Sequence, residues 1–363
     1  MNRISNIAFL FFFFVLALLP ALKIDRSSIV SKEENRLLAP FPFVFSNSVP
    51  NSCFGRQFED WYSDRFWGRS EMVRLHTALM SRFDGRVENE KAFGKRNGWM
   101  FLTGPAKDSF GWSVFSDAVK KVIVDGLNRQ GAWCNAHGIR FCFLLVPEKS
   151  TIYGEFAEWR FRRKGVSPAE SLLGVVREGA AYPVVWPKQA FLRRKKDGLL
   201  YHPADSHWNM FGSRIAFFEV LSALGLGSYV PDDGDDRRTI GPKDGDSGSD
   251  LANLLGVEAR FEPYSLPSSG PWAGCFVEQK TAIENPNAPI PLSIMIVGDS
   301  FRLRLAPWAA AFFRRSFVVH RLEFNPEMID SFCPDIVLAE YVERFLPQAA
   351  RFSFETGYKK AGL

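Results

Sequence analysis

The chain has 363 residues, of which 46% are hydrophobic and 15% aromatic, so it can bury a large core and is not disordered. Its net charge of +5 is scattered along the sequence, whereas a dedicated nucleic-acid surface needs a concentrated basic stripe. None of the five cysteines has the spacing of a zinc site, and their odd number argues against a complete disulfide framework.

The N-terminus carries an uncharged apolar run, Ile7–Leu22, between Arg3 and Lys23. Its length suits a signal-peptide core or a short membrane anchor. Leu19 stands where a cleavage site needs a small residue, so we predict an uncleaved anchor over residues 1–23. A cleaved signal, which leaves a soluble exported protein, is the alternative. A single N-terminal apolar segment usually starts export, so we expect the body outside the cytoplasm.

Residues 24–52 are polar and contain prolines, and we interpret them as a linker to one large domain over residues 53–363. Helical spacing of apolar residues predicts helices over residues 54–82, 114–137, 167–179, 210–224 and 303–313. Short apolar runs predict strands over residues 98–102, 140–146, 182–186, 293–297, 317–322 and 335–339. Because helices alternate with apolar strands, we predict an α/β sandwich with a mainly parallel central sheet.

The first feature that carries chemistry is Gly298-Asp299-Ser300, which follows a predicted buried strand and precedes a helical pattern. In open α/β sheets, ligands bind beyond the carboxyl ends of the strands, so Ser300 can present its hydroxyl there. Gly298 is expected to permit a sharp turn. Backbone N–H groups around Ser300 can then face a developing oxyanion. Taken alone, Gly-Asp-Ser is also a common turn.

The second feature is Asp205-Ser-His207-Trp208, in an irregular segment before a predicted helix. A serine hydroxyl needs a neighbouring base to become a nucleophile, and histidine is the usual one. A carboxylate can hold the tautomer of that histidine, so Asp205 and His207 can serve one site. His202 competes for the role but lacks this upstream acid. A capping Asp with a surface His is the alternative interpretation.

Together the two blocks resemble the SGNH hydrolase arrangement of serine esterases. Here the Asp-x-His-Trp block precedes the serine, and that order resembles the AlgX/AlgJ-type family of SGNH-hydrolase-like proteins, which O-acetylate alginate and related exopolysaccharides in the Gram-negative periplasm. The resemblance covers most of residues 33–346 and fits an AlgJ-like layout without a C-terminal carbohydrate-binding module. Supporting matches lie at residues 34–36, 58–64, 98–102, 146–149 and 340–344.

The resemblance implies that Ser300 is the nucleophile, His207 its base and Asp205 the acid that orients His207, on an SGNH-hydrolase-like fold preceded by the anchor. It implies O-acetyl transfer to hydroxyls of an exported polysaccharide, alginate or a similar one, through an acetyl-serine. The protein is expected in the periplasm, anchored to the inner membrane.

The resemblance also implies a partner, a multi-span membrane-bound O-acyltransferase that supplies acetyl groups, ultimately from acetyl-CoA. It implies no metal and no bound cofactor. Two alternatives stay open: a carbohydrate esterase with the same triad, and a non-catalytic polysaccharide-binding scaffold of the export machinery.

Other candidates concern substrate binding. Lys149 and Arg344 can bind an acidic sugar, with salt bridges as the alternative. Trp208 and Trp99 can stack on sugar rings or pack in the core. The Asp- and Gly-rich stretch Asp232–Asp250 lacks the closing Glu of a calcium loop, so we predict a solvated loop.

Overall fold

A computed structural model describes residues 30–31, 36–46, 49–65, 85–95, 98–231, 241–242, 250–255, 264–265, 282–355 and 357–358, together with residues 14, 71, 72 and 75. The predicted anchor lies outside these residues except for Phe14, and so does most of the Asp-rich stretch. Within the described ranges, no helix has the length and apolar character needed to cross a membrane.

The chain divides into two compact units, one formed by residues 1–89 and 252–258, the other by residues 90–251 and 259–363. The described elements of the first unit's N-terminal part are β1 (Val30–Ser31), β2 (Arg36–Leu37), β3 (Phe45–Ser46), β4 (Val49–Pro50), α2 (Phe54–Arg65) and β5 (Arg86–Glu88). Phe41 packs edge-on against Trp61 of α2, with ring centroids 4.8 Å apart. The helix predicted over residues 54–82 is observed as α2, which begins at Phe54 and ends at Arg65. Most of residues 66–82 lie outside the described residues.

The second unit is built around a six-stranded sheet in the order β12-β14-β13-β15-β8-β9. Its strands are β8 (Arg140–Val146), β9 (Val184–Val185), β12 (Ile283–Glu284), β13 (Ile290–Gly298), β14 (Phe313–His320) and β15 (Ile336–Val342). All neighbours run parallel except β12, which is antiparallel to β14. The predicted α/β fold with a mainly parallel sheet is thus confirmed.

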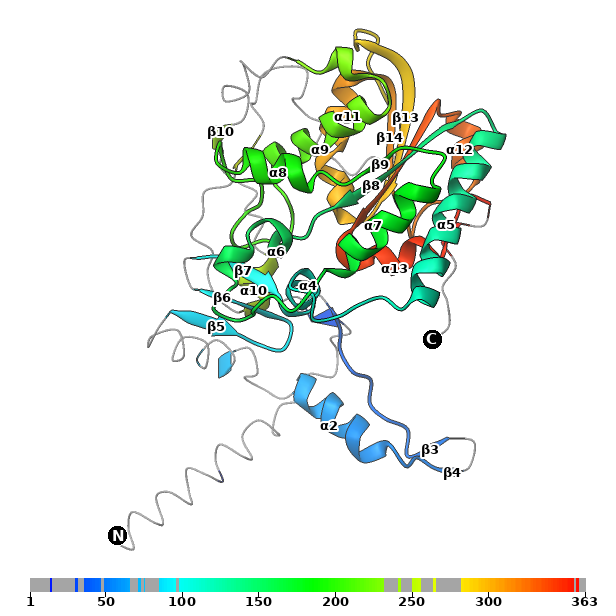
Figure 1. Cartoon of the computed structure of the whole chain (residues 1–363). Helices are drawn as coiled ribbons and strands as arrows, with labels where there is room; N and C mark the ends of the chain where they lie inside the picture. Colours follow the sequence, from blue (N-terminus) through cyan, green and yellow to red (C-terminus); the bar gives the residue numbers. More distant parts are fainter. Residues whose placement is uncertain are drawn as a thin grey trace, which may run out of the picture. The chain divides into compact units, whose positions relative to one another are not determined.

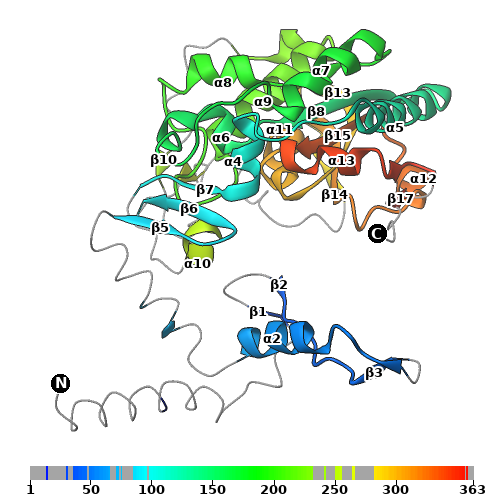
Figure 2. The same cartoon turned by 60° about the horizontal axis from the view of Figure 1, so that its bottom comes forward.

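Helices cover both faces of this sheet (Figure 1). One face packs against α5 (Asp117–Ala136), α7 (Pro168–Gly179), α12 (Glu327–Phe332) and α13 (Leu346–Ala349). The other packs against α8 (Lys188–Arg194), α9 (Met210–Ala223) and α11 (Ala306–Phe312). Figure 2 shows α13 beside α5, and residues of both belong to the same hydrophobic cluster.

Burial on both faces explains why the central strands read as unbroken apolar runs. Successive side chains of a strand point to opposite faces. In β8, Phe143 therefore packs on the side of α5, whereas Leu144 packs on the side of α9.

The second unit also contains short elements. They are β6 (Ala92–Lys95), β7 (Met100–Leu102), α4 (Thr103–Ser109), α6 (Lys149–Ile152), η2 (Gly154–Phe156), η3 (Gly227–Tyr229), β10 (Gly241–Pro242), β11 (Tyr264–Ser265), η5 (Ser300–Arg304), η6 (Glu343–Phe345), β16 (Phe352–Ser353) and β17 (Gly357–Tyr358). The helix α10 (Asp250–Leu255) begins with a residue of the second unit.

Local sequence signals set several helix ends. Ser167 and Glu170 form a reciprocal capping box at the start of α7. Gly138, with φ of +70°, follows the end of α5. The predicted helix over residues 303–313 differs: a 3₁₀ turn ends at Arg304, and Pro307 lies in the first turn of α11. Proline lacks an N–H and favours a helix start, so the two turns do not merge.

Candidate active site

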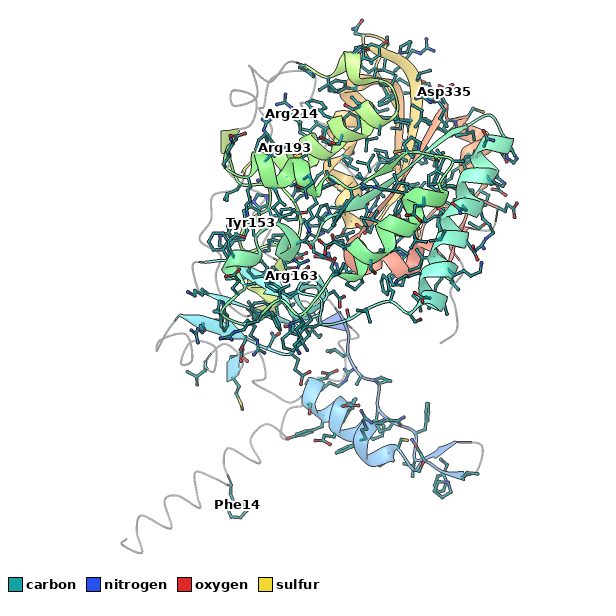
Figure 3. All side chains as sticks on the ribbon, viewed as in Figure 1. Phe14, Tyr153, Arg163, Arg193, Arg214 and Asp335 are labelled. Carbon is teal, nitrogen blue, oxygen red and sulfur yellow. The ribbon has the colours of Figure 1, made fainter. Side chains whose placement is uncertain are left out.

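The candidate residues gather at the carboxyl edge of the sheet, the edge where ligands bind in open α/β folds. Ser300 follows β13, Lys149 follows β8 and Arg344 follows β15, and these three strands are parallel neighbours. Figure 3 marks the opposite edge with Asp335, whose carboxylate accepts hydrogen bonds from the backbone N–H and the hydroxyl of Ser293, both at 2.7 Å. The sheet therefore brings together residues that are about 200 positions apart in the sequence.

The turn before Ser300 is fixed by two buried carboxyl groups. The Asp299 side chain accepts hydrogen bonds from the N–H groups of Phe301 and Val342, each at 2.9 Å. The Asp299 N–H in turn donates to Glu340 Oε2 at 3.0 Å. Burial and the neighbouring Asp299 raise the pKa of Glu340 well above its ordinary value, which favours the protonated acid.

Gly298 has a role other than the predicted one. Its φ is not positive, so the turn does not need the conformational freedom of glycine. A Cβ atom at this position would lie 2.3 Å from Glu340 Oε2 and 2.9 Å from Glu340 Cβ. Glycine is required here because the side chain of Glu340 packs directly against the backbone of β13.

The structure brings the three candidate catalytic side chains into one hydrogen-bonded chain. His207 Nε2 lies 2.7 Å from Ser300 Oγ, and His207 Nδ1 lies 2.7 Å from Asp205 Oδ1. The His207 backbone N–H also donates to Asp205 Oδ1 at 2.8 Å. Asp205 is buried, whereas a quarter of the His207 side chain is exposed, which leaves the imidazole accessible from solvent.

The protonation states follow from these contacts. Burial acts to raise the pKa of Asp205, but the hydrogen bonds and positive charge of His207 and a backbone N–H from Asp250 outweigh it and hold that pKa well below its ordinary value. An ionised carboxylate only accepts hydrogen bonds, so Nδ1 of His207 carries the ring proton. When the imidazole carries only this proton, Nε2 accepts from the Ser300 hydroxyl.

The N–H groups around Ser300 are not equivalent as oxyanion donors. The Phe301 N–H already donates to Asp299, so it is committed to the turn. In the part of the chain that the structure describes, the Ser300 N–H has no hydrogen-bond partner. It is therefore the better of the two donors for an oxyanion formed at Ser300.

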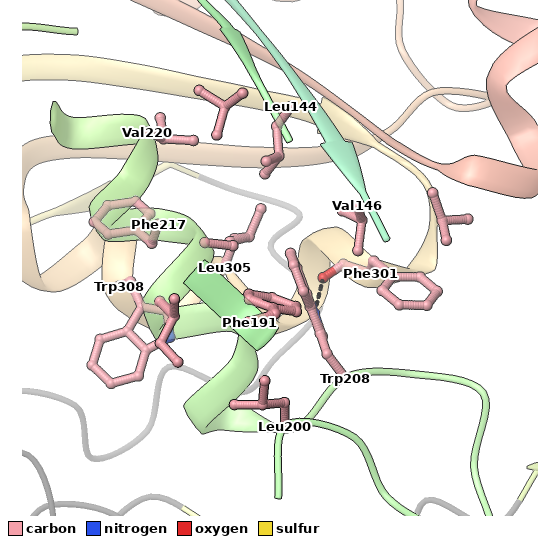
Figure 4. Packing of buried hydrophobic residues seen from close by; sticks show 14 of the residues in the cluster. Leu144, Val146, Phe191, Leu200, Trp208, Phe217, Val220, Phe301, Leu305 and Trp308 are labelled. Atoms are coloured by element: carbon pink, nitrogen blue, oxygen red, sulfur yellow. Dashed lines mark hydrogen bonds between the residues drawn. The ribbon is translucent and has the colours of Figure 1, made fainter. Parts of the chain in front are cut away.

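Trp208 fixes the end of the Asp205–His207 segment in the core. Its indole is fully buried and its Nε1–H donates to the Phe301 carbonyl at 3.1 Å, as Figure 4 shows beside Phe191 and Leu200. A ring without exposed surface offers no face to a sugar, so the described arrangement favours core packing, the alternative considered for Trp208. Its part in the site is to join the histidine segment to the serine turn.

Lys149 is also buried, with 3% of its surface exposed. Its ammonium donates to the backbone carbonyls of His202, Pro203 and Asp205 at 3.2, 2.9 and 2.6 Å. These contacts use all three N–H donors and leave none for a ligand. The described arrangement therefore gives no support to the predicted binding of an acidic sugar by Lys149.

Arg344 forms the salt bridge that we considered as the alternative to ligand binding. Its Nη1 donates to both carboxylate oxygens of Glu148, at 2.8 and 2.9 Å, and its guanidinium lies 5.2 Å from the Phe301 ring centroid. Burial acts to lower the pKa of Arg344, but Glu148 and Asp299 raise it above its ordinary value, so the group stays charged. No described residue binds its Nε or Nη2, and substrate binding by Arg344 stays a prediction.

Asp250 is a site residue that the sequence did not reveal, because it lies at the end of the stretch predicted as a solvated loop. Its carboxylate accepts from the Ser206 N–H at 2.6 Å and from the Ser206 hydroxyl. Its own N–H donates to Asp205 Oδ2 at 3.3 Å. The available signal was its place before the apolar run Leu251–Leu255, where Asp is a common helix start.

Asp205, His207 and Asp250 also form a possible metal-binding group, since their ligand atoms lie within 4.8 Å of one another. However, both ring nitrogens of His207 are engaged, with Asp205 and with Ser300. A metal would have to break one of these two contacts. We therefore assign the side chains of Asp205 and His207 to the hydrogen bonds with Ser300 and not to a metal.

Comparisons with known proteins identify similar folds. No family model and no curated protein sequence matches the chain. A DHHW family protein from Eubacterium siraeum matches with a TM-score of 0.51 and 13% identity, over 76% of this chain and 98% of that one. Bacillus cereus PatB1 matches with a TM-score of 0.43 and 17% sequence identity, over 72% of this chain and 96% of that one. The O-acetyltransferase domain of Pseudomonas putida AlgJ matches with a TM-score of 0.41 and 16% sequence identity, over 69% of this chain and 90% of that one. At these identities the similarity is one of fold.

Proposed function

We propose that the chain is a serine-dependent O-acetyltransferase that acts on hydroxyl groups of an exported polysaccharide, alginate or a similar exopolysaccharide. The observation that carries the proposal is the unbroken chain from Asp205 through His207 to Ser300, with both contacts at 2.7 Å. A non-catalytic scaffold has no need for a base placed against a serine hydroxyl. The resemblance of the two sequence blocks to the AlgX/AlgJ-type family supports the choice of acetyl as the acyl group.

In the first half-reaction, His207 Nε2 takes the proton of Ser300 Oγ as Oγ attacks the acetyl carbonyl of the donor. The Ser300 N–H stabilises the oxyanion, and Asp205 stabilises the imidazolium. Collapse breaks the bond between the acetyl carbon and the donor's leaving group. His207 returns its proton to that leaving group, and acetyl-Ser300 remains.

In the second half-reaction, a sugar hydroxyl replaces the leaving group. His207 takes the proton of this hydroxyl as its oxygen attacks acetyl-Ser300. The ester bond to Ser300 breaks, the proton returns to Ser300 Oγ, and the acetylated sugar leaves. Because a quarter of the His207 side chain is exposed, water is a competing acceptor, and transfer requires that the polysaccharide outcompete it.

The cellular setting is part of the same proposal. The chain faces the periplasm, held to the inner membrane by residues 1–23 or released from it by cleavage. A multi-span membrane-bound O-acyltransferase supplies acetyl groups that derive from cytoplasmic acetyl-CoA. The apolar run at the N-terminus and the family resemblance support this setting.

The proposal is tested by covalent capture of Ser300. Intact-mass spectrometry after exposure to an activated acetyl ester should show one acetyl adduct, which peptide mapping assigns to Ser300. Ser300→Ala should abolish the adduct while the melting temperature changes little, because the Ser300 hydroxyl contacts His207 at the surface of the core. A folded wild-type chain without an adduct on Ser300 contradicts the proposed chemistry and favours a scaffold.

Clearance of the adduct separates transferase from esterase. Acetyl-Ser300 should disappear faster when acceptor oligosaccharides are added than in buffer alone, with acetyl appearing on the sugar. Equal clearance in both conditions, with acetate as the product, identifies an esterase that uses the same residues.

A further inference from the structure

The segment that carries Asp205 and His207 lies outside the central sheet and depends on neighbouring groups for its position. Tyr201 donates its hydroxyl to the Pro147 carbonyl at 2.5 Å, and the Met100 N–H donates to the Pro203 carbonyl at 3.0 Å. Catalytic geometry is sensitive to this support, because a displacement of about 1 Å can cost about 10²-fold in rate.

Lys149 makes the most concentrated set of contacts with this segment. Its ammonium donates to three carbonyl oxygens within a stretch of four residues, at 2.6 to 3.2 Å. It also lies 5.2 Å from the ring centroid of Phe101 and 5.8 Å from that of Trp99. No described carboxylate lies within salt-bridge distance of Lys149 Nζ.

A buried lysine without an ion pair is unusual, because removing an ammonium from water is costly. Here the carbonyl oxygens and the two ring faces take the place of water. Three acceptors match the three donors of an ammonium, whereas a neutral amine has only two. Burial lowers the pKa of Lys149 to about 7, and the nearby carboxylates of Asp250, Asp205 and Glu148 act against this shift. The full set of three contacts therefore forms only with the charged amine.

The shortest of the three hydrogen bonds joins Lys149 to one of the three residues that form the catalytic hydrogen bonds. The carbonyl at 2.6 Å belongs to Asp205, whose side chain orients His207. Lys149 itself follows β8, a strand with all of its residues after Arg140 buried. Lys149 thus connects the end of β8 to the backbone of Asp205, the residue whose side chain orients the His207 imidazole.

We propose that Lys149 is a positioning residue of the active site: it fastens the carbonyls of residues 202, 203 and 205 to the end of β8, and thereby holds His207 against Ser300. This role rests on the proposed function. It replaces the sugar-binding role predicted for Lys149, and it requires no contact between Lys149 and any substrate.

The test removes the ammonium and then returns it as a small molecule. In full-length Lys149→Ala, acetylation of Ser300 by an activated acetyl ester should slow by about 10²-fold, with the KM for the ester unchanged. Propylammonium matches the deleted part of the side chain and should restore much of the rate. Propanol, which fills the same space with one donor and no charge, should not.

Lys195→Ala is the matched control. Lys195 Nζ also donates to a backbone carbonyl, that of Ile152 at 2.8 Å, and also lies over an aromatic ring, that of Tyr153 at 5.3 Å. Its ammonium makes no hydrogen bond with residues 202–205 and pairs instead with Glu155 at 2.7 Å. Its acetylation rate should equal that of the wild type, and propylammonium should have no effect.

A second readout does not depend on acetyl transfer. The proton on His207 Nδ1, bound to Asp205, should give a downfield NMR signal that His207→Gln removes. Lys149→Ala should lose or broaden this signal, and propylammonium should restore it. Dependence of the signal on Lys149 in a chain that never acetylates Ser300 would support the positioning role while refuting the proposed function.

Retention of both the signal and the rate in Lys149→Ala overturns the proposal. If the alanine variant does not fold, Lys149→Met preserves the apolar stem, and the same two readouts apply. The native chain gives a test that needs no variant: at about pH 5, below the pKa of about 7 for Lys149, its ammonium should give a protected ¹⁵N signal. Rapid exchange of its protons at that pH would equally overturn the proposal.

Discussion

At the scale of single residues, the two histidines near the triad differ in what their rings contact. His207 places one ring nitrogen on Asp205 and the other on Ser300. His202 is buried, and burial together with the nearby Arg304 lowers its pKa to about 4. The backbone carbonyl of His202, rather than its ring, is what joins the site, through Lys149.

Substitution of the two histidines should therefore separate a chemical role from a structural one. His207→Ala should lower the rate of Ser300 acetylation by about four orders of magnitude or more, because the base is lost. Asp205→Asn should cost about 10⁴-fold, because an amide favours the wrong tautomer. Both variants should keep a cooperative thermal transition, measured by circular dichroism.

His202→Ala serves as the control. It should lower the melting temperature, because it opens a cavity at a buried position, while its acetylation rate stays near that of the wild type. If His202→Ala were inactive and His207→Ala active, the assignment of the base would be wrong.

At the scale of elements, the ends of β8 and β15 are joined by a network of acidic side chains. The Glu343 carboxyl accepts hydrogen bonds from the Thr151 hydroxyl at 2.6 Å, the Glu148 N–H at 3.1 Å and the Trp186 indole at 3.0 Å. Burial nevertheless raises the pKa of Glu343 from 4.5 to about 7, with Glu148 adding to the shift.

This raised pKa predicts a loss of stability as the pH rises. Folding favours the protonated Glu343, so its contribution is complete below pH 4.5 and is lost as the pH rises through about 7. The loss is at most about 3 kcal/mol, and smaller because the side chain is partly exposed. In Glu343→Gln, the fall in the free energy of unfolding between pH 5 and pH 8, measured with urea, should be smaller than in the wild type.

Glu355→Gln removes a carboxyl group from an exposed position and is the matched control. Its pH dependence should follow that of the wild type. The slope with pH is the informative quantity, since Glu343→Gln also changes a hydrogen-bonding group and lowers stability at every pH. An unchanged slope in Glu343→Gln would show that Glu343 is ionised throughout this range.

At the scale of the whole molecule, the proposed function requires that the active site and an exported polymer share a compartment. The apolar run Ile7–Leu22 is the feature of the chain that bears on this requirement. The charged residues Lys23 and Arg26 follow it closely and weaken the charge asymmetry that orients a membrane segment. Orientation and retention therefore need a direct measurement.

We expect the full-length chain to fractionate with the inner membrane, with its body accessible to protease from the periplasmic side. Residues 1–23 should still be present in N-terminal sequencing, because Leu19 is a poor residue for cleavage. A soluble product that begins near Leu22 would contradict the anchor while leaving export intact. Protease protection in intact spheroplasts would contradict export itself.

The sequence by itself predicted most of the main strands and helices, and the resemblance of two motifs to a known family pointed to Asp205, His207 and Ser300. Unbroken apolar runs predicted the buried strands β8, β13 and β15, because a strand covered on both faces has no polar side. The spacing of Asp205 and His207 and the position of Ser300 after a predicted strand also indicated candidate site residues. Each of these patterns is local and depends on neighbouring residues, whereas the contact between His207 and Ser300 joins distant segments.

Only the tertiary structure decided which residues hold Asp205, His207 and Ser300 in place, because these residues are held by contacts between distant segments of the sequence. Nothing in the sequence near Lys149 indicates that its ammonium binds the carbonyls of residues 202, 203 and 205. Likewise, the need for glycine at position 298 comes from the packing of Glu340 against it, and the place of Asp250 in the site comes from its hydrogen bond with Ser206. Parallel strands place such residues at one edge through crossovers of variable length, so their spacing in the sequence does not reveal that they meet.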